Sequence, residues 1–124
     1  MVSVGIVGGS GYMGGEALRV LLRHPHAEVA WATSRSPGPI EQVHPNLYDT
    51  GLHFVRLEDV KTPDFVLLAL PTGASMEVAV RFLQAGARVI DLGSAFRVKD
   101  RATWERVYGQ QHTAWSLVDR KSVV

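Results

Sequence analysis

The stretch Gly8-Gly9-Ser10-Gly11-Tyr12-Met13-Gly14 lies between a run of mostly apolar residues, Val2 to Val7, and an apolar pattern of helical spacing, Tyr12 to Arg23. Read from Gly9, it has the form G-x-G-x-x-G. Glycines at these positions permit a tight turn, a close approach of the backbone to a pyrophosphate, and close packing of helix on strand. The helix that follows offers free N–H groups and the positive end of its dipole to phosphates. This context predicts a dinucleotide-binding loop, with a purely structural glycine turn as the alternative.

Outward from this loop, the apolar runs alternate between strand and helix character. Further strands are predicted at residues 28–33, 53–57, 65–70 and 88–92, further helices at 75–85 and 100–108, and a proline-rich loop at 34–46. This alternation predicts an α/β fold, a Rossmann-type doubly wound parallel sheet with strand order 3-2-1-4-5. The sheet is expected to be incomplete, which leaves the strand at 88–92 with an unpaired edge.

The composition bounds the classes of function. With 124 residues, 46% of them hydrophobic, the chain can bury the core of one domain. A net charge of +1 does not indicate the broad basic surface that binds nucleic acid or an anionic membrane. No run approaches the roughly 18 apolar residues of a membrane span, and the chain does not begin with a signal-peptide pattern. We expect a soluble, cytoplasmic domain with no nucleic-acid or membrane partner.

Cysteine and histidine usage argues against a metal site. Zero cysteines exclude a disulfide framework, a cysteine-ligated metal and a thiol nucleophile supplied by this chain. The five histidines show no metal-binding spacing such as H-E-x-x-H, and each is expected to be a surface or core residue. No metal ligand is therefore predicted.

The end of the second predicted strand indicates which dinucleotide is bound. NAD-binding units place an acidic residue about 20 residues after the loop, where it binds the ribose 2′-hydroxyl. Here that position holds Ser34, Arg35 and Ser36, while Glu28 lies at the other end of the strand. A planar guanidinium can hold a 2′-phosphate, with the serine hydroxyls as further donors. These residues predict NADP(H), with a solvated loop arginine as the alternative for Arg35.

Several ordered motifs carry a family resemblance. They are the stretch Val4 to Pro25, Thr33-Ser-Arg-Ser36, Leu68-Ala-Leu-Pro-Thr-Gly73, Val89 to Asp100, and Tyr108-Gly-Gln-Gln-His112. Over residues 2–114 the chain resembles the N-acetyl-γ-glutamyl-phosphate reductases and the similar LysW-aminoadipate phosphate reductases of lysine biosynthesis. The resemblance implies an NADP-binding domain at residues 1–114.

The resemblance also implies a reaction, in which NADPH reduces an acyl phosphate to a semialdehyde in arginine or lysine biosynthesis. In that family a cysteine of a second domain forms a thioester, NADPH donates hydride, and a histidine acts as acid and base. The resemblance further implies a homo-oligomeric full-length enzyme. Because this chain has no cysteine, it is expected to have no catalytic residue of its own and to be inactive alone.

The glycine motif and the resemblance together assign binding residues. The predicted cofactor contacts are Gly8, Gly9, Ser10, Gly11, Tyr12, Met13, Gly14, Ser34, Arg35, Ser36, Leu70 and Pro71. Arg97 follows a predicted strand end, where α/β sheets place ligands, and is the predicted contact of the substrate phosphate. A surface ion pair is the alternative for Arg97.

Two departures from the family pattern leave alternatives open. Asp91-Leu-Gly-Ser-Ala-Phe-Arg97 is closer to the pattern of aspartate-semialdehyde dehydrogenases, which share the fold, cofactor and reaction class. Residues 115–124 no longer follow the family, so we expect a divergent tail that arises from truncation or a frameshift. The competing functions are an aspartate-semialdehyde dehydrogenase-like cofactor domain and a stand-alone, non-enzymatic dinucleotide-binding module.

Overall fold

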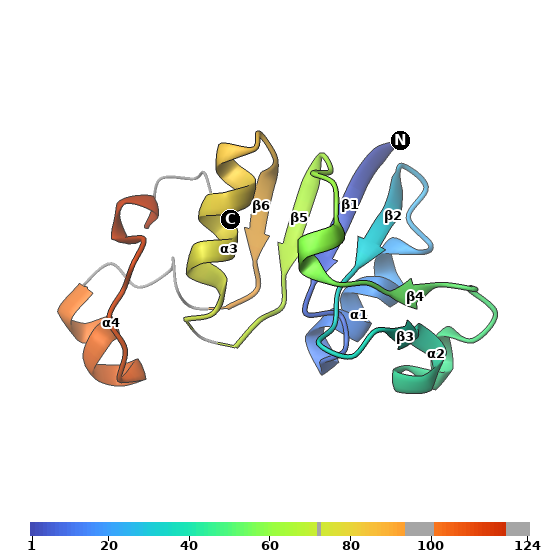
Figure 1. The fold of residues 1–124 in the computed structure, drawn as a ribbon, viewed down its shortest axis with the longest axis horizontal. Coiled ribbons are helices and arrows are strands. Elements are labelled where there is room, and N and C mark those ends of the chain that lie inside the picture. Colours follow the sequence, from blue (N-terminus) through green and yellow to red (C-terminus); the bar gives the residue numbers. More distant parts are fainter. Residues whose placement is uncertain (72, 94–100, 119–124) are drawn as a thin grey trace.

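The computed structural model describes residues 1–71, 73–93 and 101–118, and its centre is a parallel sheet (Figure 1). The sheet has the order β2-β1-β5-β6 and consists of β1 (Val2–Val7), β2 (Ala27–Ala32), β5 (Phe65–Leu68) and β6 (Arg88–Asp91). Helix α1 (Tyr12–Leu21) connects β1 to β2, and α3 (Ser75–Gln84) connects β5 to β6. The predicted Rossmann-type parallel sheet is confirmed, with helix and strand ends within one or two residues of the predicted ones.

The two helices pack on opposite faces of the sheet because successive side chains of a strand point to opposite sides. Ile6 is fully buried in one apolar cluster with Leu18 of α1. Val7 belongs to a second cluster, which includes Phe82 of α3. The indole of Trp31 on β2 extends this second cluster, with its ring centroid 5.8 Å from that of Phe82. The result is a helix–sheet–helix sandwich with β1 and β5 in the middle of the sheet.

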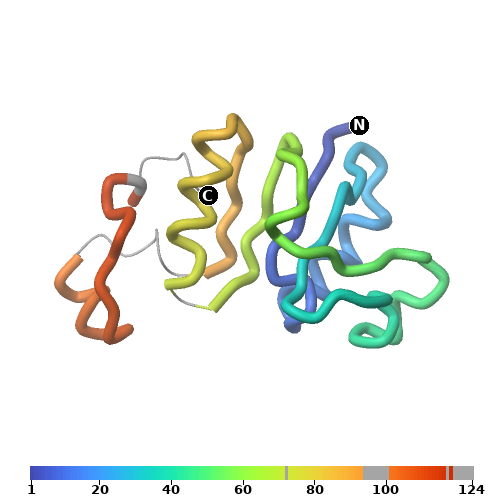
Figure 2. Tube along the Cα trace, viewed as in Figure 1, coloured from blue at the N-terminus to red at the C-terminus, as the bar shows by residue number. Residues whose placement is uncertain are grey.

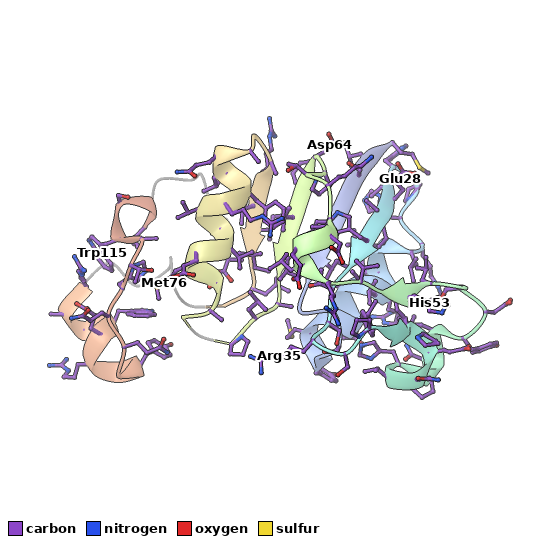
Figure 3. All side chains as sticks on the ribbon, in the orientation of Figure 1. Glu28, Arg35, His53, Asp64, Met76 and Trp115 are labelled. Carbon is purple, nitrogen blue, oxygen red and sulfur yellow. The ribbon has the colours of Figure 1, made fainter. Side chains whose placement is uncertain are left out.

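The amino ends of the two central strands are joined by a reciprocal pair of hydrogen bonds. Ser3 N–H donates to the Asp64 carboxylate at 2.9 Å, and Asp64 N–H donates to Ser3 Oγ at 2.9 Å. Parallel strands need long connections, and this contact spans 61 residues of chain. It fixes the register of β1 against β5 at the end of the sheet where Figure 3 labels Asp64.

The segment between β2 and β5 differs from the prediction. Instead of a structureless loop and a third strand at residues 53–57, it forms a two-stranded antiparallel ribbon of β3 (Gly38–Pro39) and β4 (His53–Phe54). Between them lie α2 (Ile40–Val43) and a single 3₁₀ turn, Pro45–Leu47, and a second 3₁₀ turn, Leu57–Asp59, follows β4. The ribbon lies beside β2, on the side away from β6 (Figure 2).

The prediction that residues 53–57 form a third strand of the parallel sheet is wrong. The segment does lie next to β2, as the predicted strand order requires. Only Val55 reaches β2's end, through one parallel bridge to Thr33, because residues 53–54 turn away to pair with β3. The segment is instead anchored by side chains: Ile40, Leu47 and Phe54 are buried in the cluster with Ile6 and Leu18. Packing therefore replaces strand pairing here.

The C-terminal part of the described chain is held by a cluster of rings. Helix α4 (Arg101–Tyr108) buries Trp104 completely, with its ring 4.8 Å from His112 and 5.3 Å from Tyr108. A 3₁₀ turn, Trp115–Leu117, follows and places the Trp115 ring edge-on, 5.2 Å from His112. Thr113 N–H donates to the sulfur of Met76 on α3 at 3.2 Å, which attaches this segment to the sheet domain.

The described helices have ten residues or fewer, so none of them could span a membrane.

The buried Trp104 gives a test of this packing. Trp104→Ala is expected to lower the free energy of unfolding by about 3–5 kcal/mol, because it leaves a large cavity. Trp104→Phe is expected to cost less, since it keeps a ring and removes the indole N–H, which has no hydrogen-bond partner among the described residues. Urea denaturation measures both changes. Val107→Ala, at an exposed position of the same helix, is the control and should stay within about 0.5 kcal/mol of the original chain; equal loss in all three variants would contradict the packing.

Candidate functional site

The predicted site residues gather beyond the carboxyl ends of the strands, where parallel α/β sheets place ligands. The glycine loop follows β1, Ser34 to Ser36 follow β2, and Leu70 with Pro71 follow β5. Figure 3 shows Arg35 beyond the end of the sheet opposite to Asp64 and Glu28. The structure thus brings three separate predicted groups to one edge. Arg97, the predicted substrate contact, lies outside the described residues.

The glycine loop is packed so tightly that two of its glycines have no room for a side chain. Gly8 has a φ of +81°, and a Cβ there would collide with the carbonyl oxygen of Ala69, beyond β5. A Cβ on Gly14 would collide with the carbonyl oxygen of Gly8 and lie 2.7 Å from Gly9 Cα. All of these contacts are with backbone atoms, which cannot move aside cheaply. Glycine at these two positions therefore lets the loop fold tightly on itself and against the segment after β5.

Thr33, which follows β2, holds the loop in place. Gly9 N–H donates to its carbonyl oxygen at 2.8 Å, and Gly8 N–H donates to its Oγ1 at 3.2 Å. Thr33 is itself buried and donates its N–H to Ile6 O at 2.8 Å. Thr33 is not among the site residues predicted from the sequence, although it directly precedes Ser34, Arg35 and Ser36. Its position between the strand and that motif was the available signal.

His44 contacts the same loop from the ribbon segment. Its Nε2 lies 2.7 Å from the carbonyl oxygen of Gly9, which can only accept, so Nε2 carries the proton and donates. The imidazole is half-buried and lies against Gly15, where a Cβ would collide with the ring. From the sequence, only a surface or core histidine was expected at this position. The contact joins residues 35 positions apart and has no local sequence signal.

The first turn of α1 is suited to an anion. Gly11 precedes the helix in an extended conformation, with no side chain capping the helix, and the first turn carries no acidic residue. The nearest carboxylate of the helix, Glu16, is paired with Arg19 at 2.9 Å. The hydrogen bond from Arg19, reinforced by its charge, lowers the pKa of Glu16 below its ordinary value. Both side chains are well exposed, so this pair contributes little to stability, but it balances the charge nearest the helix start.

The segment after β2 carries an unengaged cation. Arg35 is exposed and takes part in no ion pair within the described part of the chain. The turn beneath it is fixed, because Ser34 N–H donates to Val55 O at 3.3 Å and Ser36 N–H donates to Ser34 Oγ at 3.2 Å. The guanidinium therefore sits on an ordered turn. The strand's own carboxylate, Glu28, lies at the far end of the sheet (Figure 3).

The segments after β5 and β6 form the other side of the edge. The half-buried Leu70 side chain lies against the loop, with its Cδ2 3.2 Å from where a Cβ on Gly8 would be. Pro71 follows it and is exposed. Asp91, at the end of β6, is buried and accepts a hydrogen bond from Gly93 N–H at 2.8 Å, so it caps the turn that follows.

Two other kinds of ligand site are relevant here: a hollow away from this edge and a cluster of metal ligands. A hollow of about 830 Å³ is lined by Trp31, Phe54 and Val60 among others and includes no residue of the glycine loop. The hollow therefore does not include the predicted cofactor contacts. Within residues 1–71, 73–93 and 101–118, no group of three His, Cys, Asp or Glu side chains could hold a metal ion.

The tight contact at Gly14 makes a testable difference between two glycines of the loop. Gly14→Ala is expected to lower the free energy of unfolding by about 1–3 kcal/mol, because its Cβ meets the backbone of Gly8 and Gly9. Gly11→Ala is the matched control: its φ is −78°, and the nearest atom to its Cβ is 4.0 Å away, so it should stay within about 0.5 kcal/mol of the original chain. Chemical denaturation measures both; equal stability of the two variants would refute the close approach.

Comparison with known proteins agrees with this geometry. The family model described as semialdehyde dehydrogenase, NAD binding domain, matches residues 3–118. An N-acetyl-gamma-glutamyl-phosphate reductase of Pseudomonas savastanoi pv. phaseolicola is 48% identical over 95% of this chain and 36% of its own length. A [LysW]-L-2-aminoadipate 6-phosphate reductase of Deinococcus radiodurans is 43% identical over 90% of this chain and 33% of its own length. The chain thus spans about a third of the length of these relatives.

Solved structures agree on the fold. GenD2 from gentamicin A biosynthesis, in complex with NAD, has a TM-score of 0.58 and 28% identity, covering 73% of this chain and 26% of that one. Aspartate semialdehyde dehydrogenase with NADP from Candida albicans has a TM-score of 0.58 over 93% of this chain and 41% of that one, at 12% identity. The second likeness is one of fold alone.

Proposed function

The chain belongs to the semialdehyde dehydrogenase NAD-binding domain family, and from this premise we propose that it binds NADP(H) for the reduction of an acyl phosphate to an aldehyde. The observation that carries the proposal is the glycine loop at the carboxyl edge of the sheet. Its close backbone packing leaves no room for a Cβ on Gly8 or Gly14, while Gly11 at the helix start is exposed and has no atom closer than 4.0 Å to its Cβ position. A dinucleotide fits such a cradle because its pyrophosphate can approach backbone N–H groups closely. NADPH, when bound, supplies the hydride.

The pyrophosphate is proposed to lie on the loop and on the start of α1. The predicted contacts are Gly8, Gly9, Ser10, Gly11, Tyr12, Met13 and Gly14. Ser10, Gly11, Tyr12 and Met13 are exposed, so this part of the loop is accessible to a ligand. Gly9 and Gly14 are buried and shape the turn. The helix start, free of acidic residues in its first turn, favours the phosphate charge.

The adenosine 2′-phosphate is proposed to bind Arg35, with Ser34 and Ser36 as further donors. Support comes from the exposed guanidinium on an ordered turn, two residues after the loop's anchor Thr33. A carboxylate at that place would repel a 2′-phosphate, and Glu28 lies at the opposite end of β2 (Figure 3). NADP(H) is therefore favoured over NAD(H). Leu70 and Pro71 are proposed to form the wall of the cofactor cleft on the β5 side.

The substrate is proposed to be an acyl phosphate of the N-acetyl-γ-glutamyl or aminoadipyl type. The relatives named for these reactions are 42–48% identical to this chain, whereas the aspartate semialdehyde dehydrogenase structure is 12% identical. Arg97 remains the predicted contact of the substrate phosphate. A cytoplasmic location, expected from the composition, and a homo-oligomeric full-length reductase, implied by the family resemblance, remain predictions.

The first experiment tests the 2′-phosphate contact. Arg35→Ala is expected to weaken NADPH binding about tenfold or more, because a hydrogen-bonded charge pair contributes about 1.5–3 kcal/mol, and to change NADH binding little. Titration of nicotinamide fluorescence measures both affinities. Arg23→Ala, an exposed arginine beyond the other end of α1, is the control and should leave both unchanged. An equal loss for NADPH and NADH in Arg35→Ala would overturn the assignment.

The second experiment separates cofactor binding from chemistry. With no cysteine, the 124-residue chain should bind NADPH but show no oxidation of it when N-acetyl-γ-glutamyl phosphate is added. Nicotinamide absorbance measures turnover, and a complete curated relative serves as the positive control. Turnover by this chain alone would contradict the proposed division between cofactor domain and nucleophile. Tight NADPH binding without any response to a supplied catalytic domain would instead favour a stand-alone dinucleotide-binding module.

A further inference from the structure

His44 is the one histidine with a short contact to the glycine loop among the described residues, and the cofactor contacts proposed above do not include it. Both its backbone and its ring are held by neighbouring groups. The backbone N–H of His44 donates to Ile40 O at 2.9 Å, Leu47 N–H donates to His44 O at 2.9 Å, and the ring of Phe54 meets the imidazole edge-on at 6.2 Å. Gly15 leaves the space that the ring occupies. The imidazole is therefore fixed against the loop and is not a mobile surface group.

The contact orients one particular peptide group. Gly9 donates its N–H to Thr33 O and accepts the His44 Nε2–H on its carbonyl oxygen, so both of its backbone polar groups are directed into the protein. In a trans peptide the carbonyl of one residue and the N–H of the next point in opposite directions. With the Gly9 carbonyl held inward, the Ser10 N–H points away from His44. Ser10 is exposed, and its N–H has no partner within the described part of the chain.

We propose that His44 is a positioning residue for the dinucleotide: its Nε2–H holds the Gly9 carbonyl so that the Ser10 N–H faces the pyrophosphate. This inference rests on the proposed function, because it assigns a ligand to the loop. The role depends on a donor at this position, which the Nε2–H tautomer of the imidazole supplies. A side chain that keeps the ring but lacks the donor would let the Gly9–Ser10 peptide rotate.

Two substitutions separate the donor from the packing. His44→Phe keeps a ring between Gly15 and Phe54 but has no N–H, and His44→Gln supplies an amide N–H at a similar reach without the ring. We expect His44→Phe to weaken NADPH and NADH equally, by about three- to tenfold, because the pyrophosphate is common to both and one neutral hydrogen bond is lost. His44→Gln should restore most of the affinity. His24→Phe, an exposed histidine beyond the other end of α1, is the control and should change nothing.

A spectroscopic readout follows the peptide itself. In ¹⁵N-labelled original chain, NADPH is expected to shift the Ser10 amide resonance strongly, and the shift should collapse in His44→Phe and return in His44→Gln. Unchanged NADPH affinity in His44→Phe, equal weakening in Phe and Gln variants, or an unmoved Ser10 amide in a chain that binds NADPH would each overturn the role of His44. Absence of NADPH binding in the original chain would instead reject the proposed function. If His44→Phe does not fold, the Ser10 amide of the original chain and the Gln variant still decide the matter.

Discussion

Two hydrogen bonds from Gly8 and Gly9 to Thr33 join the first loop of the domain to the end of its second strand. Everything at the carboxyl edge depends on this connection. It places the bare backbone of the glycine loop next to the turn that carries Arg35, with a single residue between the anchor and that arginine. The proposed sites of the pyrophosphate and of the adenosine 2′-phosphate, two groups of one ligand, therefore share one support. Thr33, buried and bonded to Ile6, is that support.

The electrostatic attraction of an anionic ligand to this domain depends on individual groups at the carboxyl edge and not on the net charge. The net charge is +1, so no broad positive field draws an anionic ligand to the molecule. Instead, one exposed guanidinium, one helix start without acidic residues, and the amides of a glycine loop lie along the same edge. Carboxylates, which would repel an anionic ligand, lie elsewhere or are paired with a cation, as Glu16 is with Arg19. Under the proposed function, the choice between NADP(H) and NAD(H) then depends on a few residues after β2.

The sequence was sufficient to predict the four parallel strands and the two crossover helices, because their apolar periodicity is strong and glycine or proline marks most of their ends. It also placed the glycine loop and Arg35 at one edge, since parallel strands carry their following residues to the same side. Residues 34–56 were predicted poorly. Their elements are two to four residues long, and they are fixed by the burial of Ile40 and Phe54 against α1 and β1, which no local pattern reveals. His44 was missed for the same reason. Its partner is a backbone oxygen distant in sequence, and because every residue has a backbone carbonyl, no residue type indicates which one a histidine contacts.

The position of β1 in the sheet has a kinetic consequence. β1 pairs with β2 across a short helical connection, but its other neighbour, β5, begins only at Phe65, and the bonds between Ser3 and Asp64 span 61 residues. Local pairings form early in folding, whereas distant ones must first overcome the entropy of closing a long loop. The contact of Ala69 that confines Gly8 belongs to this late group. During synthesis, the glycine loop therefore leaves the ribosome early and acquires its final shape only after β5, the central strand of the second half, has been made.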